Sequence, residues 1–89
     1  AKGLRIIGAT MTPFAGSPAY TPAKEAVREA VNRWIRTSGA FDAVVDFDRV
    51  TRDPKQPNRL RADYAAEDHI HLDDAGYAAM ASAVDLSAL

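Results

Sequence analysis

A long amphipathic helix between two short apolar runs is the feature that most limits how this chain can fold. Thr21 is a favourable N-cap residue, Pro22 suits the first helical position and Gly39 suits the residue after the last turn. Residues 4–10 and 41–47 are apolar and short, which is typical of strands. A strand, a crossover helix and a second strand form a βαβ unit with parallel strands.

The helix has one apolar face, and we expect that face to supply core side chains. Apolar residues recur at helical spacing, whereas charged residues and Asn32 fill the other face. This pattern predicts that Trp34 and Ile35 are buried. The apolar positions are Ala23, Val27, Ala30, Val31, Trp34 and Ile35.

The rest of the chain is predicted to hold loops and one further helix. Residues 11–20 and 49–67 are rich in turn formers or lack usable periodicity, which indicates surface loops. Apolar residues return at helical spacing after Asp73 or Asp74, and this second helix is predicted to end near Leu86. We interpret the basic residues of the longer loop as a solvated surface rather than as a patch that steers a substrate. These residues are Arg49, Arg52, Lys55, Arg59 and Arg61.

Charge and cysteine content exclude several classes of protein. The 11 Lys and Arg residues are balanced by 12 Asp and Glu residues, so the basic excess of a nucleic-acid-binding protein is missing. The chain has no cysteine and therefore no disulfide or cysteine-based metal site. No apolar run approaches the roughly 20 residues of a membrane span, and no targeting segment is evident, so the compartment stays open.

The size of the predicted sheet indicates that a partner is needed. A chain of 89 residues has a marginal core, and two parallel strands leave unpaired backbone groups on their outer edges. We therefore predict a homodimer or higher oligomer that completes the sheet.

The densest group of chemically capable side chains lies in residues 67–74, just before the second helix. Asp68 and His71 are spaced so that the carboxylate can orient the imidazole for acid–base work. Alternatively, His69, His71 and an aspartate could hold a metal ion. A third interpretation is structural, with an aspartate capping the helix and both histidines as ordinary loop residues. The residues alone leave all three open.

Residues 68–81, Asp-His-Ile-His-Leu-Asp-Asp-Ala-Gly-Tyr-Ala-Ala-Met-Ala, resemble the last motif block of the SGNH (GDSL-type) ester hydrolases. Residues 3–14 resemble the family's penultimate strand and its Thr-Pro-Phe loop, and residues 43–48 resemble its last strand. The resemblance covers nearly the whole chain but only the C-terminal portion of such an enzyme. It implies a single domain over residues 1–89, a βαβα fragment of a flavodoxin-like three-layer α/β/α sandwich. The implied activity is hydrolysis of esters, lipids or acetylated sugars.

By the same resemblance, Asp68 matches the triad aspartate and His71 the triad histidine. The family's Gly-Asp-Ser nucleophile block and its Gly-x-Asn-Asp block do not occur in these residues. Ser17, in the loop after the first strand, is a possible replacement nucleophile, although Gly-Ser-Pro is first of all a turn. No organic cofactor is implied, since neither a Gly-x-Gly-x-x-Gly nor a P-loop pattern occurs.

Two classes of function follow from this pattern. The first is an ester hydrolase, or a fragment of one, that acts on a small ester and lacks a metal. Its partner would be a second copy or a missing N-terminal half. The second is a non-catalytic α/β oligomerisation or binding module that retains a remnant of the site. Neither class involves nucleic acid or a membrane span.

Overall fold

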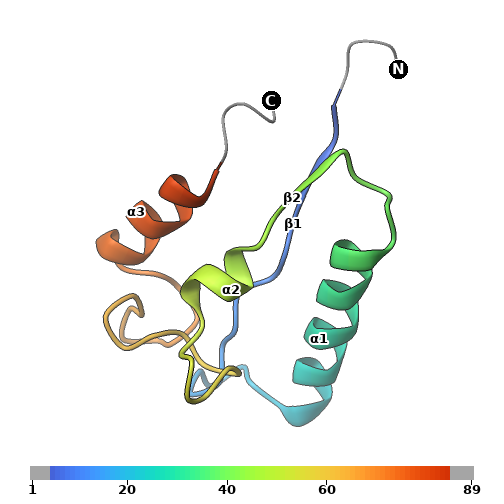
Figure 1. The fold of residues 1–89 in the computed structure, drawn as a ribbon. Coiled ribbons are helices and arrows are strands. Elements are labelled where there is room, and N and C mark those ends of the chain that lie inside the picture. The colour runs from blue at the N-terminus through green and yellow to red at the C-terminus, as the bar shows by residue number, and fades with distance from the viewer. Residues whose placement is uncertain (1–4, 85–89) are drawn as a thin grey trace.

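A computed structural model describes residues 5–84 of the chain and places two strands and three helices in them (Figure 1). The predicted strand–helix–strand order is confirmed, although both strands are shorter than predicted. The predicted strand start at Leu4 and helix end near Leu86 lie outside the described residues. In chain order the elements are β1 (Ile7–Ala9), α1 (Pro22–Thr37), β2 (Ala43–Val45), α2 (Phe47–Thr51) and α3 (Asp74–Ala83).

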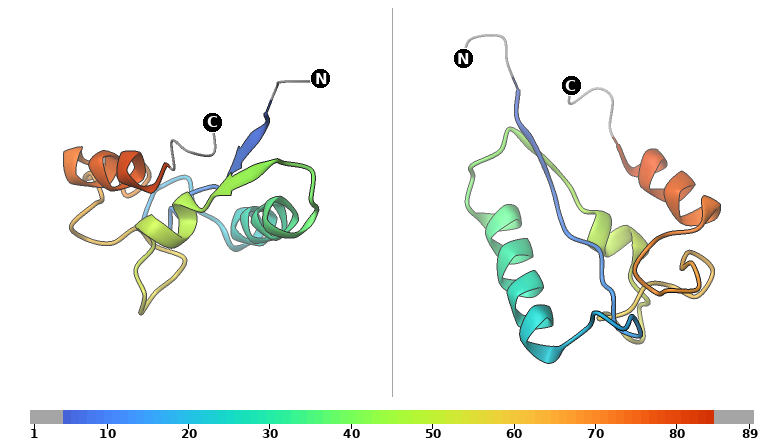
Figure 2. Two further views of the ribbon diagram at one scale, coloured as in Figure 1. Left: turned by 45° about the horizontal axis from the view of Figure 1, so that its top comes forward. Right: turned by 180° about the vertical axis from the view of Figure 1, so that it is seen from behind.

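The two strands form a parallel pair, as the sequence predicts. Ile7 lies opposite Ala43, and Ala9 lies opposite Val45. Helices α1 and α3 lie on either side of this pair, and α2 follows β2 directly (Figures 1 and 2). The described residues therefore form a small mixed α/β unit whose two strands are paired only with each other.

The signals at both ends of α1 act as the sequence predicts. The Thr21 hydroxyl oxygen accepts a hydrogen bond from the Lys24 amide at 3.1 Å, and Pro22 occupies the first turn. Gly39 has a φ of 73°, a left-handed conformation that favours glycine after a helix. The cap residues therefore fix where this helix begins and where the chain turns toward β2.

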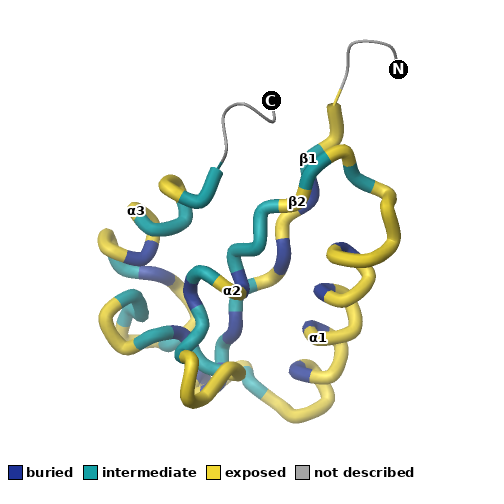
Figure 3. The backbone as a smooth tube through the Cα atoms, viewed as in Figure 1, coloured by how far each residue is buried: buried dark blue, intermediate teal, exposed yellow. Residues whose placement is uncertain are grey.

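The face that α1 turns toward the strands is mostly polar, which corrects the predicted core. Its buried residues are Glu25, Arg28, Asn32 and Ile35, and Asn32 is only 1% exposed, whereas Trp34 is 55% exposed (Figure 3). Ile35 is buried as predicted, but the prediction for Trp34 is wrong. The prediction that Asn32 lies on the solvent-facing side of the helix is also wrong.

The physical reason is that the inward polar groups of α1 have partners at the strand ends. The Asn32 side chain accepts from the Met11 amide at 2.7 Å and donates to the Met11 carbonyl at 2.9 Å. Arg28 pairs with Glu25 and with Asp48. Because these hydrogen bonds are satisfied, polar groups can be buried, and the helix is rotated away from the orientation that its apolar periodicity predicts.

Helix α2 replaces the end of the predicted second strand and the start of the predicted long loop. Asp46 caps it, accepting from the Arg49 amide at 3.1 Å, so the strand ends at Val45. The two ends of the loop that follows are joined by an isolated antiparallel β-bridge between Arg52 and Leu60.

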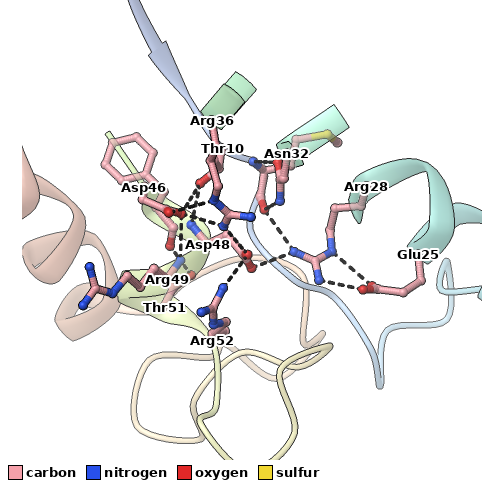
Figure 4. Close-up of polar contacts among 12 residues, drawn as sticks. Thr10, Glu25, Arg28, Asn32, Arg36, Asp46, Asp48, Arg49, Thr51 and Arg52 are labelled. Carbon is pink, nitrogen blue, oxygen red and sulfur yellow. Dashed lines mark hydrogen bonds and ion pairs between the residues drawn. The ribbon is translucent and has the colours of Figure 1, made fainter. Parts of the chain in front are cut away.

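A buried ion-pair cluster joins α1, α2 and the residue after α2 (Figure 4). The Asp48 carboxylate contacts Arg28 Nη1 at 2.7 Å, Arg36 Nη2 at 2.8 Å and Arg52 Nη1 at 3.0 Å. Arg52 is therefore an ion-pair partner, and the prediction that it belongs to a solvated surface is wrong. Thr10 extends the cluster, since its hydroxyl donates to Asp46 and accepts from the Asp48 amide.

Low pH should weaken this cluster because it protonates the Asp46 carboxylate. Two hydrogen bonds from Arg36, at 2.8 Å each, are the main reason that the pKa of Asp46 falls from 3.8 to about 2. A carboxyl group with a lowered pKa stabilises the fold above its unfolded pKa, and this stabilisation is lost as the pH falls from about 4 toward about 2. We therefore expect Asp46→Asn to lose less stability than the parent between pH 5 and pH 2. Urea unfolding at several pH values measures this difference, and equal losses in both proteins would contradict it.

Candidate active site

The segment before α3 folds back on itself and is closed by backbone hydrogen bonds. Ala65 and Leu72 form an antiparallel bridge, and the Ala66 amide donates to the His71 carbonyl at 2.9 Å. The Asp73 amide donates to the Tyr64 carbonyl at 2.8 Å. This loop, residues 64–73, brings the side chains of positions 68 and 71 to one side of a tight turn.

Asp68 and His71 form the closest polar side-chain contact of this loop. His71 Nδ1 lies 2.5 Å from Asp68 Oδ2. The other oxygen, Oδ1, accepts from the Ile70 amide at 3.0 Å and from the His71 amide at 2.9 Å. The carboxylate is thus held by one imidazole and two backbone donors, and its orientation is fixed.

The protonation of this pair follows from the same contacts. The hydrogen bond with the His71 ring, followed by those from the His71 and Ile70 amides, lowers the pKa of Asp68 to about 2. Asp68 is therefore ionised at neutral pH and can only accept. The proton in the contact then belongs to Nδ1, and Nε2 of the neutral imidazole is the free acceptor.

The pair is open to solvent in this chain. The His71 side chain is 71% exposed and the Asp68 side chain 44% exposed. An exposed imidazole with an ionised carboxylate behind it can take a proton from a hydroxyl group and return it. The arrangement therefore fits acid–base work on a group that approaches from outside the described residues.

The model of the GDSL-like Lipase/Acylhydrolase family matches residues 1–79 of this sequence. The chain belongs to this family. The match includes both Asp68 and His71, and it agrees with the resemblance found in the sequence. No curated protein matches the chain.

In this family member, Asp73 takes the structural role predicted for an aspartate before the helix. Its Oδ1 accepts from the Gly76 amide at 2.8 Å, which makes it the N-cap of α3. A Cβ on Gly76 would lie 2.6 Å from the Tyr64 carbonyl oxygen, so the first turn of α3 packs directly on the loop. The cap and this close approach hold the 64–73 loop in place.

Ser17 lies in a turn of its own. It is buried, its hydroxyl oxygen accepts from the Ala19 amide at 3.1 Å and its amide donates to the Phe14 carbonyl. These contacts are those of a serine that stabilises a turn. Among the hydrogen bonds of the described residues, none joins Ser17 to His71.

His69 points to a different neighbour from His71. Its ring lies near Gly16, since a Cβ built on that glycine would be 3.3 Å from His69 Cγ. His69 has a φ of 59°, a left-handed conformation that is uncommon for residues other than glycine. Within residues 5–84, no three His, Asp or Glu side chains are grouped so that they could hold a metal ion.

None of the helices in residues 5–84 has the length and apolarity needed to cross a bilayer.

Proposed function

We propose that this chain carries the acid–base part of an ester hydrolase site, with His71 as the catalytic base and acid and Asp68 as its orienting residue. The observation that carries the proposal is the short Nδ1–Oδ2 contact, because it holds the imidazole with Nε2 free. A non-catalytic role for the same chain is the second candidate, since the sequence lacks the family's Gly-Asp-Ser block.

The reaction would proceed by acyl transfer. His71 Nε2 removes the proton from a nucleophilic hydroxyl as that oxygen attacks the ester carbonyl carbon. The bond to the alcohol oxygen then breaks, and His71 returns the proton to the leaving alkoxide. Water repeats the sequence on the acyl intermediate, releasing the acid. Asp68 stabilises the imidazolium in both steps, and a positioned acid–base group of this kind contributes about 10²–10⁴-fold in rate.

The nucleophile and the oxyanion-hole donors are proposed to come from a segment outside these 89 residues. Two observations support this. Neither family block that supplies them occurs in the sequence, and the Ser17 hydroxyl is engaged in its own turn. The loss of one oxyanion donor alone costs about 2.7–4 kcal/mol of barrier lowering. The 89-residue chain by itself should therefore hydrolyse only activated esters, and slowly.

Hydrolysis of p-nitrophenyl acetate tests the proposed role of His71. We expect slow turnover by the parent and a loss of about 10²-fold in His71→Ala, since the acid–base group is removed. His69→Ala is the matched control and should keep the parent rate, as should Ser17→Ala. EDTA should have no effect. A His71→Ala protein as active as the parent would contradict the proposal, and an inactive parent would favour the binding module.

We also propose that the sheet is completed by a second copy of the chain or by an N-terminal half of the same kind of enzyme. The support is an exposed apolar stripe on α1 next to two strands that pair only with each other. The stripe is formed by the side chains of Val27, Val31 and Trp34.

Sedimentation of the isolated chain tests the first of these partners. At tens of micromolar we expect a dimer in the parent, and a monomer in Trp34→Glu because a charge is placed where apolar surface is to be covered. Arg33→Glu also changes the charge of an exposed α1 residue, but outside the stripe, and should leave the dimer intact. A parent that sediments as a monomer would rule out the second copy.

A further inference from the structure

A largely apolar pocket of about 450 Å³ lies next to the loop that carries Asp68 and His71. Pockets that bind small molecules usually have volumes of about 300–1,000 Å³. Its walls come from the segment after β1, the start of α2, the 64–73 loop and α3. The apolar side chains that line it are Met11, Phe14, Phe47, Ile70 and Met80.

Ile70 connects this pocket to the proposed catalytic pair. Its side chain lines the pocket, its amide donates to Asp68 Oδ1 at 3.0 Å, and His71 is the next residue. Met11 and Phe47 follow β1 and β2, so the pocket also lies at the carboxyl ends of parallel strands. Ligands of open α/β sheets bind at that edge. The pocket therefore shares the loop of the proposed catalytic pair and lies at the edge of the sheet where a ligand is expected.

The lining favours a hydrocarbon over a sugar. Among the described residues that form the pocket, none is charged and only Thr10 and Thr12 carry hydroxyl groups. The Thr10 hydroxyl is already bonded to Asp46 and to the Asp48 amide. A sugar ring would leave most of its hydroxyl groups without partners there, which is costly. Methionine side chains, by contrast, adapt to flexible apolar ligands.

We propose that this pocket binds the acyl chain of the ester, and that the substrate carries an apolar acyl group of several carbons rather than a sugar. The inference rests on the proposed function for the placement of the ester group at His71. Ile70 and Met80 are then specificity-determining residues, because they contact the chain of the acid and not its reacting carbon.

Binding of octanoate, the acid product of such an ester, tests the pocket without requiring turnover. The chain has two methionines, and both line the pocket, so ¹³C labelling of the methionine methyl groups gives two signals that report on it. We expect both signals to shift and saturate as octanoate is added, and neither to shift with acetate at the same concentrations. Unchanged methyl signals with octanoate would overturn the inference.

Variants locate the bound chain. Met80→Gln and Ile70→Gln each place an amide in the apolar wall, and each should weaken octanoate binding by about tenfold. Ile70 is partly exposed, so its variant keeps the test valid if Met80→Gln folds poorly. Tyr77→Gln is the matched control, since Tyr77 is an exposed residue of the same helix as Met80 and lies outside this pocket, and it should bind as the parent does. If Tyr77→Gln weakens binding as much as the pocket variants, octanoate lies outside the pocket and the inference is overturned.

The pocket and the proposed function fail in different ways. His71→Ala should still bind octanoate, because the imidazole does not line the pocket. Octanoate binding together with hydrolysis that does not depend on His71 would leave the pocket in place and overturn the proposed function. Hydrolysis that depends on His71, without octanoate binding, would support the proposed function and overturn the pocket.

Discussion

Asp48→Asn is expected to cost about 3–5 kcal/mol of folding free energy, because it removes the charge on which three arginines converge. The side chains of Arg28 and Asp48 are 3% and 6% exposed. An asparagine at position 48 can still accept a hydrogen bond, but it carries no charge, so Glu25 is left as the carboxylate that balances the Arg28 guanidinium. A buried cation that loses one partner pays much of its desolvation penalty uncompensated.

This loss is large for a domain of this size. At about 0.05–0.15 kcal/mol per residue, typical stabilities for a small domain are only a few to about a dozen kcal/mol. Urea unfolding followed by circular dichroism measures the change. Asp63→Asn is the matched control, because its partner Arg61 and Asp63 itself are exposed, and it should cost no more than about 1 kcal/mol. A cost below about 1 kcal/mol for Asp48→Asn would mean that other acceptors satisfy Arg28.

Asp68→Asn is expected to reduce ester hydrolysis by up to about 10²-fold, the loss expected for His71→Ala, because Asp68 acts only through that imidazole. An asparagine at this position can still accept the Ile70 and His71 amides through its oxygen, so the loop should keep its shape. However, its amide can donate to Nδ1 and favour the wrong tautomer, and it does not stabilise an imidazolium. The loss should therefore appear in catalysis and not in folding.

Two readouts separate this orienting role from a structural one. Nitrogen NMR should show the proton on Nδ1 of His71 in the parent and a mixture of tautomers in Asp68→Asn. Because the pKa of Asp68 is about 2, Asp68 stays ionised between pH 4 and pH 8, and its own titration should not change the activity of the parent in that range. Asp74→Asn, at an exposed position in the first turn of α3, is the control and should leave both readouts unchanged. An Asp68→Asn protein with parent activity would remove Asp68 from the mechanism.

Local signals in the sequence predict the framework of the fold well. Thr21 and Gly39 act within a few residues of themselves, through a cap and a left-handed φ, and both are predicted correctly. Asp73 also acts locally, and it is one of the two residues predicted as the cap of the second helix. The Asp68–His71 contact is also local, since it spans a single turn closed by backbone bonds. Such features depend on short spacing, which a sequence displays directly.

Features that depend on distant partners are predicted poorly. The burial of Asn32 and the exposure of Trp34 follow from contacts with Met11 and Asp48, which lie on other segments. Likewise, the apolar pocket joins Met11 and Met80 across most of the chain, and no spacing rule brings them together. The end of β2 was missed because Asp46 acts as a cap, a role that its position after an apolar run does not reveal.

The orientation of α1 also has a consequence for the life of the protein in a cell. Helix α1 buries Glu25 and Arg28 and exposes Val27 and Trp34. Exposed apolar surface of this kind is what chaperones and proteases recognise in incompletely folded proteins. If the proposed partner covers the stripe, we expect covered copies to be protected from degradation and uncovered copies to be removed faster. The abundance of this chain should then follow the supply of that partner.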